Sequence, residues 1–281
     1  MVAPLKRVLI CAPESVGWEN GQNWSELGYG HAPDFARAQA QHAALRQELE
    51  AVGAEVLSLP KRDGLSLDAV YVHDASFITS FGAVLLAMGK TGRRAEPSSH
   101  REFYQSLGIA VLGEIRAPGT VESGDLVWLD DRTVLAGHSF RTNADGIEQL
   151  HNLLAPHGIT VLSAPLPYAA GPACCLHLMS LMSVLDEHTM LVDLPLLAVE
   201  TVELLREGGF DFISIDASER DSLACNVLAL GNRRLLAIEQ NQRSNQRLLE
   251  AGFDVRTFPG DEIGINGGGG PTCLTRPILR G

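Results

Sequence analysis

The sequence predicts a closed α/β fold built from five similar units. A short phrase recurs in which a helical stretch ends, a glycine follows, and a β-rich run begins. A glycine at this point adopts the left-handed conformation that ends a helix, so each copy predicts a helix followed by a strand. The copies lie at intervals of 43 to 55 residues and centre on Gly53, Gly108, Gly158, Gly209 and Gly252.

The elements of each unit follow in order. Residues 35–52 predict an amphipathic helix, because Phe35, Ala38, Leu45, Leu49 and Val52 fall on one face. After each phrase come two further β-rich runs separated by a turn, and the turns fall at residues 130–132, 186–188 and 231–232. The N-terminal run RVLICAP completes the fifth ββαβ-type unit, so residues 1–281 are predicted to form one domain.

The longest stretch without predicted structure is residues 14–32. A loop of this length in a compact domain is typically a lid or a binding loop. Its aromatic residues Trp18, Trp24 and Tyr29 predict a lid that stacks on a substrate, with Asn20 and Asn23 placed to contact it. The alternatives are a loop packed over the core and a dimer contact.

Composition excludes several classes of function. The 281 residues contain 22 Lys and Arg against 34 Asp and Glu, which gives a formal charge of −12. An acidic chain without a basic run is a poor candidate for binding nucleic acid or an anionic membrane. No apolar run is long enough to span a membrane, and the N-terminal run lacks the features of a signal peptide. We therefore expect a soluble, cytoplasmic protein.

The cysteines form neither a disulfide framework nor a zinc motif, because they are odd in number and irregularly spaced. Four of them are expected to be inert core residues. Cys273 differs because it closely follows four consecutive glycines, which let the backbone approach a substrate and permit a tight turn with positive φ. The five are Cys11, Cys174, Cys175, Cys225 and Cys273.

A polar residue opens the second strand of each unit. In a ring of equivalent units these positions converge near the axis, and they are Asp74, Glu122, His177, Asn226 and Cys273. A cysteine is a nucleophile as its thiolate, a histidine protonates a leaving group and then activates water, and a carboxylate orients the histidine or binds a cation. A core histidine and a structural cysteine are the alternatives, but their joint occurrence favours catalysis. Asn226 is interpreted as structural.

These residues resemble the guanidine-modifying superfamily of fivefold pseudosymmetric α/β propellers, and its dimethylarginine dimethylaminohydrolase branch most closely. The superfamily also contains deiminases of arginine and agmatine, and amidinotransferases. Six segments match family segments in order over almost the whole chain: VYVHDASFI, MGKTGRRAEP, TVESGDLVWL, HSFRTNADGIEQL, LHLMS and GGGGPTCLT.

The resemblance implies a hydrolase that cleaves a C–N bond of an Nω-methylated arginine or a similar guanidino acid. Cys273 would attack the guanidinium carbon, and His177, held by Glu122, would protonate the departing amine. Water would then hydrolyse a covalent thiouronium intermediate to a ureido product such as citrulline. Asp74 would bind the cationic N–H groups. The resemblance requires no metal or organic cofactor, and it alone implies a homodimer.

Two arginines match the family positions that hold the substrate carboxylate, namely Arg93 and Arg141. Without the resemblance we would interpret both as members of surface salt bridges. Because carboxylates near the cysteine disfavour its thiolate, we expect the bound cation or His177 to activate the thiol.

Two positions depart from the family patterns. Met179 replaces an aspartate of deiminases, which argues against a plain arginine or agmatine deiminase and leaves room for an apolar substituent. His73 replaces an acidic residue that dimethylaminohydrolases carry, so cation binding would be weaker or the substrate different; the alternative is a partly exposed strand residue. An arginine deiminase or dihydrolase, an amidinotransferase and a non-catalytic binding scaffold remain the competing hypotheses.

Overall fold

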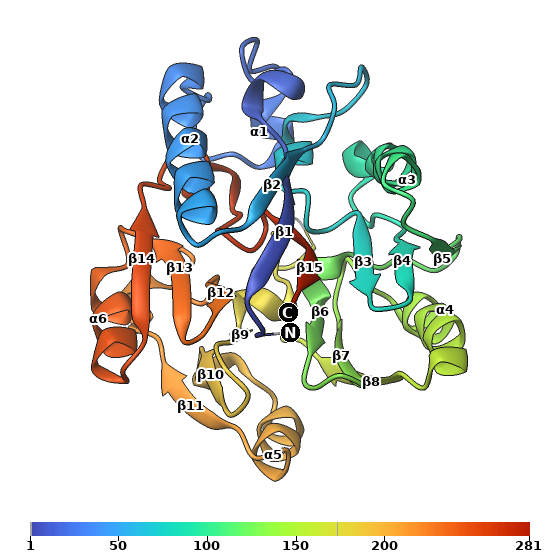
Figure 1. Cartoon of the computed structure of the whole chain (residues 1–281), viewed down its shortest axis with the longest axis vertical. Coiled ribbons are helices and arrows are strands. Elements are labelled where there is room, and N and C mark those ends of the chain that lie inside the picture. Colours follow the sequence, from blue (N-terminus) through green and yellow to red (C-terminus); the bar gives the residue numbers. More distant parts are fainter. Residues whose placement is uncertain (1, 173) are drawn as a thin grey trace.

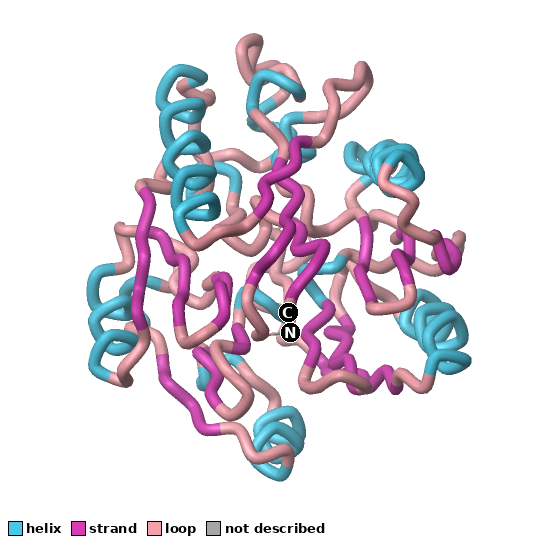
Figure 2. The backbone as a smooth tube through the Cα atoms, viewed as in Figure 1, coloured by secondary structure: helices cyan, strands magenta, loops and turns pink. Residues whose placement is uncertain are grey.

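The computed structural model describes residues 2–172 and 174–281, and this part of the chain contains five three-stranded sheets grouped around a common centre (Figure 1). The strands lie toward the centre and most of the helices lie at the rim (Figure 2). The strands are β1 (Leu5–Ile10), β2 (Glu55–Ser58), β3 (Ser76–Thr79), β4 (Gly82–Leu85), β5 (Val111–Glu114), β6 (Leu126–Trp128), β7 (Thr133–His138), β8 (Thr160–Pro165), β9 (Met182–Val184), β10 (Thr189–Val192), β11 (Asp211–Ser214), β12 (Leu228–Gly231), β13 (Arg234–Ile238), β14 (Asp254–Phe258) and β15 (Arg276–Arg280). The helices are α1 (Trp24–Leu27), α2 (Phe35–Ala51), α3 (Glu96–Ser106), α4 (Ala144–Leu154), α5 (Val199–Glu207) and α6 (Gln242–Glu250).

All five sheets share one topology. In the sheet β6-β7-β8, for example, β6 and β7 form an antiparallel hairpin, α4 follows, and β8 returns parallel to β7. The sheets β3-β4-β5, β9-β10-β11 and β12-β13-β14 repeat this order. The fifth sheet, β15-β1-β2, joins strands from opposite ends of the sequence, with α2 between β1 and β2. The prediction that the N-terminal strand completes a unit is therefore confirmed.

The repeated glycines end the helical segments as predicted. Their φ angles are positive, between 69° and 86°, and the third strand of each unit begins two or three residues later. An L residue with a side chain rarely adopts this conformation, so the glycines are a requirement of the backbone. The hairpin turns are also confirmed; in the β12–β13 turn, Asn232 and Arg233 have φ of 55° and 57°, typical of a two-residue type I′ loop.

The core lies between adjacent sheets. The α2 helix buries Ala38, Leu45 and Leu49, in agreement with its predicted face. Clusters of buried apolar side chains join each sheet to its neighbours; Phe77 of β3, for example, stacks on Trp128 of β6 with ring centroids 5.1 Å apart. The five sheets are thus held together mainly by apolar contact between units.

The aromatic lid predicted for residues 14–32 is wrong for two of its three aromatic residues. Trp18 and Tyr29 are 1% and 5% exposed and pack edge to face with ring centroids 5.6 Å apart. The indole N–H of Trp18 donates to the Leu67 carbonyl at 3.1 Å. The loop is therefore packed over the core, because segments distant in sequence cover it. Asn23, which caps α1, is exposed and has a φ of 61°.

All five cysteines are free thiols, but only Cys11, Cys225 and Cys273 are buried. The expectation that Cys174 and Cys175 are core residues is wrong, because the connection between β8 and β9 places both at the surface.

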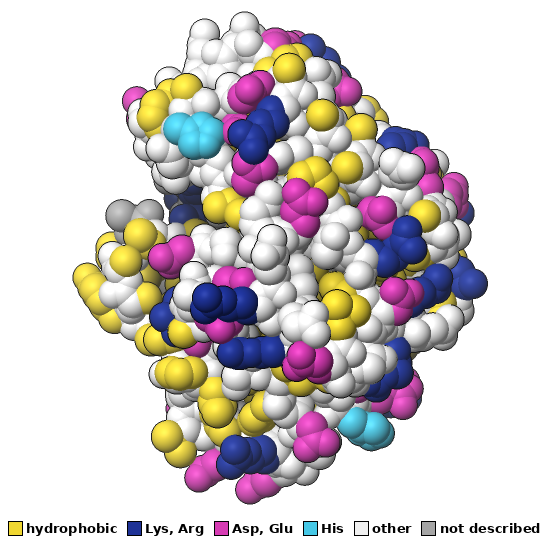
Figure 3. All heavy atoms as spheres, turned by 90° about the vertical axis from the view of Figure 1, so that its left-hand side faces the viewer, with side chains coloured by type: hydrophobic (Ala, Val, Ile, Leu, Met, Phe, Trp, Pro, Cys, Tyr) yellow, Lys and Arg dark blue, Asp and Glu magenta, His cyan; other side chains and the backbone are white. Residues whose placement is uncertain are grey.

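The surface carries charges of both signs. On the face that Figure 3 shows, acidic and basic side chains are interspersed among apolar ones. Across the described residues, no helix combines the length and the apolar character needed to cross a membrane.

Candidate active site

Hydrogen bonds tie together segments that are far apart in sequence and that carry the predicted catalytic residues. The His73 N–H donates to the Cys273 carbonyl at 3.1 Å, and the Ser123 N–H donates to the Asp74 carbonyl at 3.1 Å. The Gly124 N–H donates to Asp74 Oδ1 at 2.9 Å. The structure thus brings the thiol segment beside both carboxylate segments, as the equivalent positions predicted.

The histidine segment is held by the same motif. Asp125, three residues after Glu122, accepts the Leu178 N–H at 2.9 Å and the Ser139 hydroxyl at 2.6 Å. A methyl group on Gly124 would lie 2.3 Å from His177 Nδ1, so only glycine permits this approach. Asp125 was not predicted as a site residue, although it stands in the same TVESGDLVWL segment.

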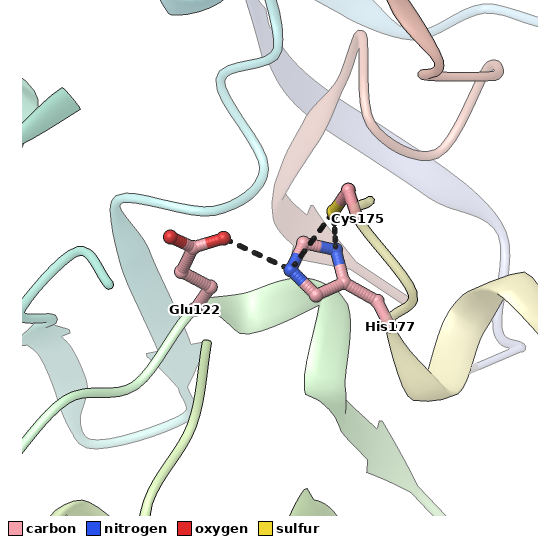
Figure 4. Close-up of side chains that lie close together, drawn as sticks. All are labelled: Glu122, Cys175 and His177. Carbon is pink, nitrogen blue, oxygen red and sulfur yellow. Dashed lines mark hydrogen bonds and ion pairs between the residues drawn. The ribbon is translucent and has the colours of Figure 1, made fainter. Parts of the chain in front are cut away.

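Glu122 and His177 form a buried pair (Figure 4). Glu122 is 0% exposed, and its Oε2 lies 2.9 Å from His177 Nε2. Its other oxygen accepts the Lys90 N–H at 3.0 Å and faces Arg141 Nη1 at 3.5 Å. On the opposite side of the ring, His177 Nδ1 lies 4.0 Å from Asp74 Oδ1. The imidazole is therefore oriented by one carboxylate and faces a second.

This surrounding favours the protonated form of His177. Burial alone would lower the pKa of His177, but the Cys175 sulfur and the carboxylates of Asp125 and Asp74 raise it well above its usual value. The hydrogen bond from His177 in turn holds the pKa of Glu122 below its usual value, although burial acts in the opposite direction. An imidazolium paired with a carboxylate can act as a general acid.

Asp74 is ionised and already partnered. Burial would raise the pKa of Asp74, but Arg93 and His177 hold it well below its usual range. Arg93 Nη1 donates to Asp74 Oδ2 at 2.6 Å, and Nε and Nη2 bind both oxygens of Glu96. The Tyr71 carbonyl accepts a further N–H of Arg93 at 2.9 Å. Arg93 therefore supports Asp74 in this structure, and its predicted contact with a substrate carboxylate stays a prediction.

Cys273 is 9% exposed and is held by an amide. Asn226 Nδ2 donates to its sulfur at 3.2 Å, while Asn226 Oδ1 accepts the Thr272 N–H at 2.9 Å. Burial, helped by the Asp74 charge, raises the pKa of Cys273 to about 12, although His177 and Asn226 oppose the rise. The resting thiol is therefore neutral. Asn226 was interpreted as structural, yet it contacts the sulfur directly.

The four glycines before Cys273 serve close packing. A methyl group on Gly269 would lie 2.5 Å from the Tyr71 ring, and one on Gly270 would lie 2.6 Å from Asn226 Oδ1. Gly268 alone among the four has a φ in the left-handed range, at 81°. The expected positive φ is thus confirmed at Gly268, and at Gly269 and Gly270 two neighbouring side chains of the protein fill the space that the missing Cβ atoms leave.

Other predicted residues lie as follows. The Arg141 side chain is largely buried beside Glu122. The His73 ring is buried with Nδ1 2.9 Å from the Thr275 carbonyl, and burial, reinforced by Arg276, lowers its pKa to about 3. Met179 is half-buried among apolar side chains.

Cys175 is a neighbour of the site that the sequence did not indicate. Its sulfur lies 3.6 Å from both ring nitrogens of His177 (Figure 4). A carboxylate oxygen of Glu122, the Cys175 sulfur and a ring nitrogen of His177 all lie within 4.8 Å of one another. This donor set could hold a soft divalent ion such as Zn²⁺. The residue was overlooked because its apolar sequence surroundings favoured an inert core cysteine.

Comparison with known proteins places these residues in a family. The family model described as N,N dimethylarginine dimethylhydrolase, eukaryotic, matches residues 28–280. The chain belongs to this family. The predicted membership of the guanidine-modifying superfamily and the prediction of a hydrolase are thereby confirmed.

A bacterial relative is similar to this chain in both sequence and structure. The N(G),N(G)-dimethylarginine dimethylaminohydrolase of Pseudomonas aeruginosa is 29% identical over 237 residues, which are 84% of this chain and 85% of the relative. A solved structure of the Pseudomonas aeruginosa enzyme, a cysteine-to-serine mutant complexed with citrulline, has a TM-score of 0.78 at 28% identity and covers 99% of this chain and 100% of that one.

A further structure agrees in fold alone. The N-terminal domain of ArgZ, an arginine dihydrolase from cyanobacteria, has a TM-score of 0.83 at 22% identity and covers 98% of both chains.

Proposed function

We propose that this enzyme cleaves a C–N bond of an Nω-methylated arginine or a similar guanidino acid, with Cys273 as nucleophile. The observation that carries the proposal is the buried Glu122–His177 pair, which faces the ionised Asp74 beside the Cys273 segment. The citrulline bound to the Pseudomonas relative supports a ureido product.

The first half-reaction makes a covalent intermediate. The substrate cation lies against Asp74 and offsets the charge that opposes thiolate formation, so the Cys273 proton passes to solvent. The thiolate attacks the guanidinium carbon and forms a C–S bond. The imidazolium of His177 gives its proton to the departing amine nitrogen, and the C–N bond breaks. A thiouronium adduct and a neutral His177 remain.

The second half-reaction regenerates the enzyme. Neutral His177 takes a proton from water, and the water oxygen attacks the thiouronium carbon. The C–S bond breaks with its electron pair on sulfur, the hydroxyl proton of the adduct passes through solvent to the Cys273 thiolate, and the product leaves as a ureido acid. Glu122 stabilises each imidazolium state through its hydrogen bond to Nε2. Arg141, Arg93, His73 and Asn23 are proposed to shape the binding site around the rest of the substrate.

The proposal includes the architecture. We interpret the five sheets as the units of a pseudosymmetric propeller in a single catalytic domain over residues 1–281, with the substrate at the axis. A homodimer stays an expectation from the resemblance.

The test is a product assay with a panel of guanidino compounds: arginine, Nω-methylated arginines, agmatine and guanidino acids without an α-amino group. Release of dimethylamine and citrulline from dimethylarginine, abolished in Cys273→Ser and retained in Cys225→Ser, is the expected result. Cys225 is a suitable control because it is also buried, but in a different apolar cluster from Cys273. Turnover that survives Cys273→Ser would overturn the proposal, and turnover of arginine in preference to its methylated forms would favour the arginine deiminase or dihydrolase hypothesis.

The state of the thiol provides a second readout. Because its pKa is raised, iodoacetamide should modify Cys273 slowly at neutral pH, and a bound guanidinium that leaves the sulfur accessible should accelerate the reaction. Peptide mapping is needed, since Cys174 and Cys175 are exposed and will also react.

A further inference from the structure

A cavity of about 90 Å³ continues from the active-site segments toward Val2 and Ala3. Its walls are formed by residues that follow the five predicted polar positions along the chain, including Phe77, Leu126, Met182, Val227 and Arg276. Most of this wall is apolar. The cavity therefore lies along the common centre of the five sheets, where β15 runs in Figure 1.

Two arginines of β15 share this cavity. Arg276 and Arg280 lie at the two ends of this strand, and both line the cavity. Arg276 Nη2 donates to the His73 carbonyl and to the Ser123 hydroxyl, and Arg280 Nη1 donates to the Ala3 carbonyl at 2.9 Å. Each of these acceptors is uncharged. Within residues 2–172 and 174–281, neither guanidinium has a carboxylate oxygen within 4.0 Å.

Both guanidinium groups also keep an unused donor. The Nε atoms of Arg276 and Arg280 are buried and have no hydrogen-bond partner among the described side chains and backbone groups. Burial lowers the pKa of each to about 10, and for Arg276 the neighbouring Tyr104 hydroxyl and the Asp74 carboxylate only partly oppose this. Both are still cationic at neutral pH. A buried Arg276 and a half-buried Arg280, neither with a salt-bridge partner in the described part of the chain, are costly, so the cavity favours a negative occupant.

We propose that this cavity binds a small inorganic anion between Arg276 and Arg280. The volume suffices for an ion of the size of chloride or phosphate, with room for water beside chloride. An anion would accept the two unused Nε–H groups and offset both charges. His73 Nδ1 must donate to the Thr275 carbonyl, which leaves Nε2 as an acceptor, and a water molecule beside the anion would satisfy it.

The site is coupled to the catalytic residues through Arg276. Its guanidinium donates to the carbonyl of His73, which directly precedes Asp74. It also donates to the side chain of Ser123, which directly follows Glu122. Arg276 is thus a positioning residue. An anion that fixes its guanidinium would also fix the backbone beside both carboxylates, without contacting the substrate.

The first experiment measures thermal unfolding of the full chain at constant ionic strength while sodium gluconate is replaced by sodium chloride or sodium phosphate. At ten times the dissociation constant of the bound ion, we expect the midpoint to rise by about 3 °C. Arg280→Met should lose this rise, and its stability in gluconate should be equal to or higher than that of the parent, because it removes a half-buried cation that has no salt-bridge partner among the residues the structure describes. Arg94→Met removes the same charge from an exposed position and should keep the full response.

The second experiment uses the parent protein alone. Crystals grown with bromide should show an anomalous peak between the two guanidinium groups, which would support the proposal independently of any variant. A larger rise with phosphate than with chloride would identify an oxyanion, and the reverse would identify a halide. An equal response of Arg280→Met and the parent, no response of the parent to either ion, or bromide peaks confined to the surface would overturn the proposal.

Discussion

Replacing Glu122 by glutamine tests the Glu122–His177 pair, because it removes one charge and hardly changes volume. The two carboxylate oxygens have separate partners: Oε2 binds His177 Nε2 at 2.9 Å and Oε1 accepts the Lys90 N–H at 3.0 Å. Glutamine has a single acceptor oxygen. If that oxygen stays on the Lys90 N–H, the amide NH₂ faces Nε2, which must then carry no proton.

The expected effect is a loss of the general acid. The imidazolium loses a charge-assisted hydrogen bond worth about 1.5–3 kcal/mol, so the pKa of His177 falls. Since general acid catalysis contributes about 10²- to 10⁴-fold, kcat for dimethylarginine should fall within this range. KM should change less, because Asp74 is proposed to bind the cation.

The assay is kcat against pH with two substrates. On dimethylarginine the alkaline limb, where the imidazolium is lost, should move to lower pH in the variant. A substrate analogue whose leaving group is a thiolate needs no proton from His177 and should be spared. The matched control is Glu219→Gln, because Glu219 is also buried and accepts the Arg243 and Ser244 N–H groups at 2.8 Å at the start of α6. A kcat within about threefold of the parent, or equal losses on both substrates, would refute this reasoning.

Three further outcomes are expected. Asn226→Ala removes the amide hydrogen bond to the Cys273 sulfur, so iodoacetamide should modify that thiol about tenfold more slowly at fixed pH; an unchanged rate would contradict the role of the amide. Gly124→Ala places a methyl group 2.3 Å from His177 Nδ1, so activity should fall about 10²-fold and the free energy of unfolding by about 1–3 kcal/mol, as measured by kinetics and urea titration. Burial lowers the pKa of His73 to about 3, so between about pH 6.5 and 3 the unfolded chain binds a proton that the folded protein does not. The urea concentration at the unfolding midpoint should therefore fall as the pH is lowered through this window, and it should fall less in His73→Gln.

Much of the fold was predictable because its main requirement is local. A helix that must stop and turn into a strand needs a residue with positive φ, and this need appears as a glycine in every unit. Convergence of the equivalent polar positions then followed from the repeat. Glu122 and His177 lie together for this reason, although they are 55 residues apart, and the resemblance implied that they pair.

The remaining details depend on contacts between distant segments, which the sequence pattern does not contain. Trp18 resembles a residue of an exposed lid until the Leu67 segment covers it. Arg93 matches a family position that holds the substrate carboxylate. In the structure, however, Asp74 and Glu96 already accept hydrogen bonds from most of its N–H groups. Cys175 is exposed because the connection before β9 leaves the sheet, and periodicity over so short a segment cannot show this.

The pairing of β1 with β15 has a consequence for how this enzyme becomes competent during folding. Leu5 lies opposite Arg280, so this contact spans nearly the whole chain, and contacts of such long range form late and slowly. The glycine loop and Cys273 are carried by the segment that leads into β15. A refolding intermediate with the other four sheets in place would therefore lack its nucleophile, and recovery of activity should coincide with the final docking of this strand. Alkylation pulses during refolding, which find Cys273 reactive until that moment and protected after it, would time the step.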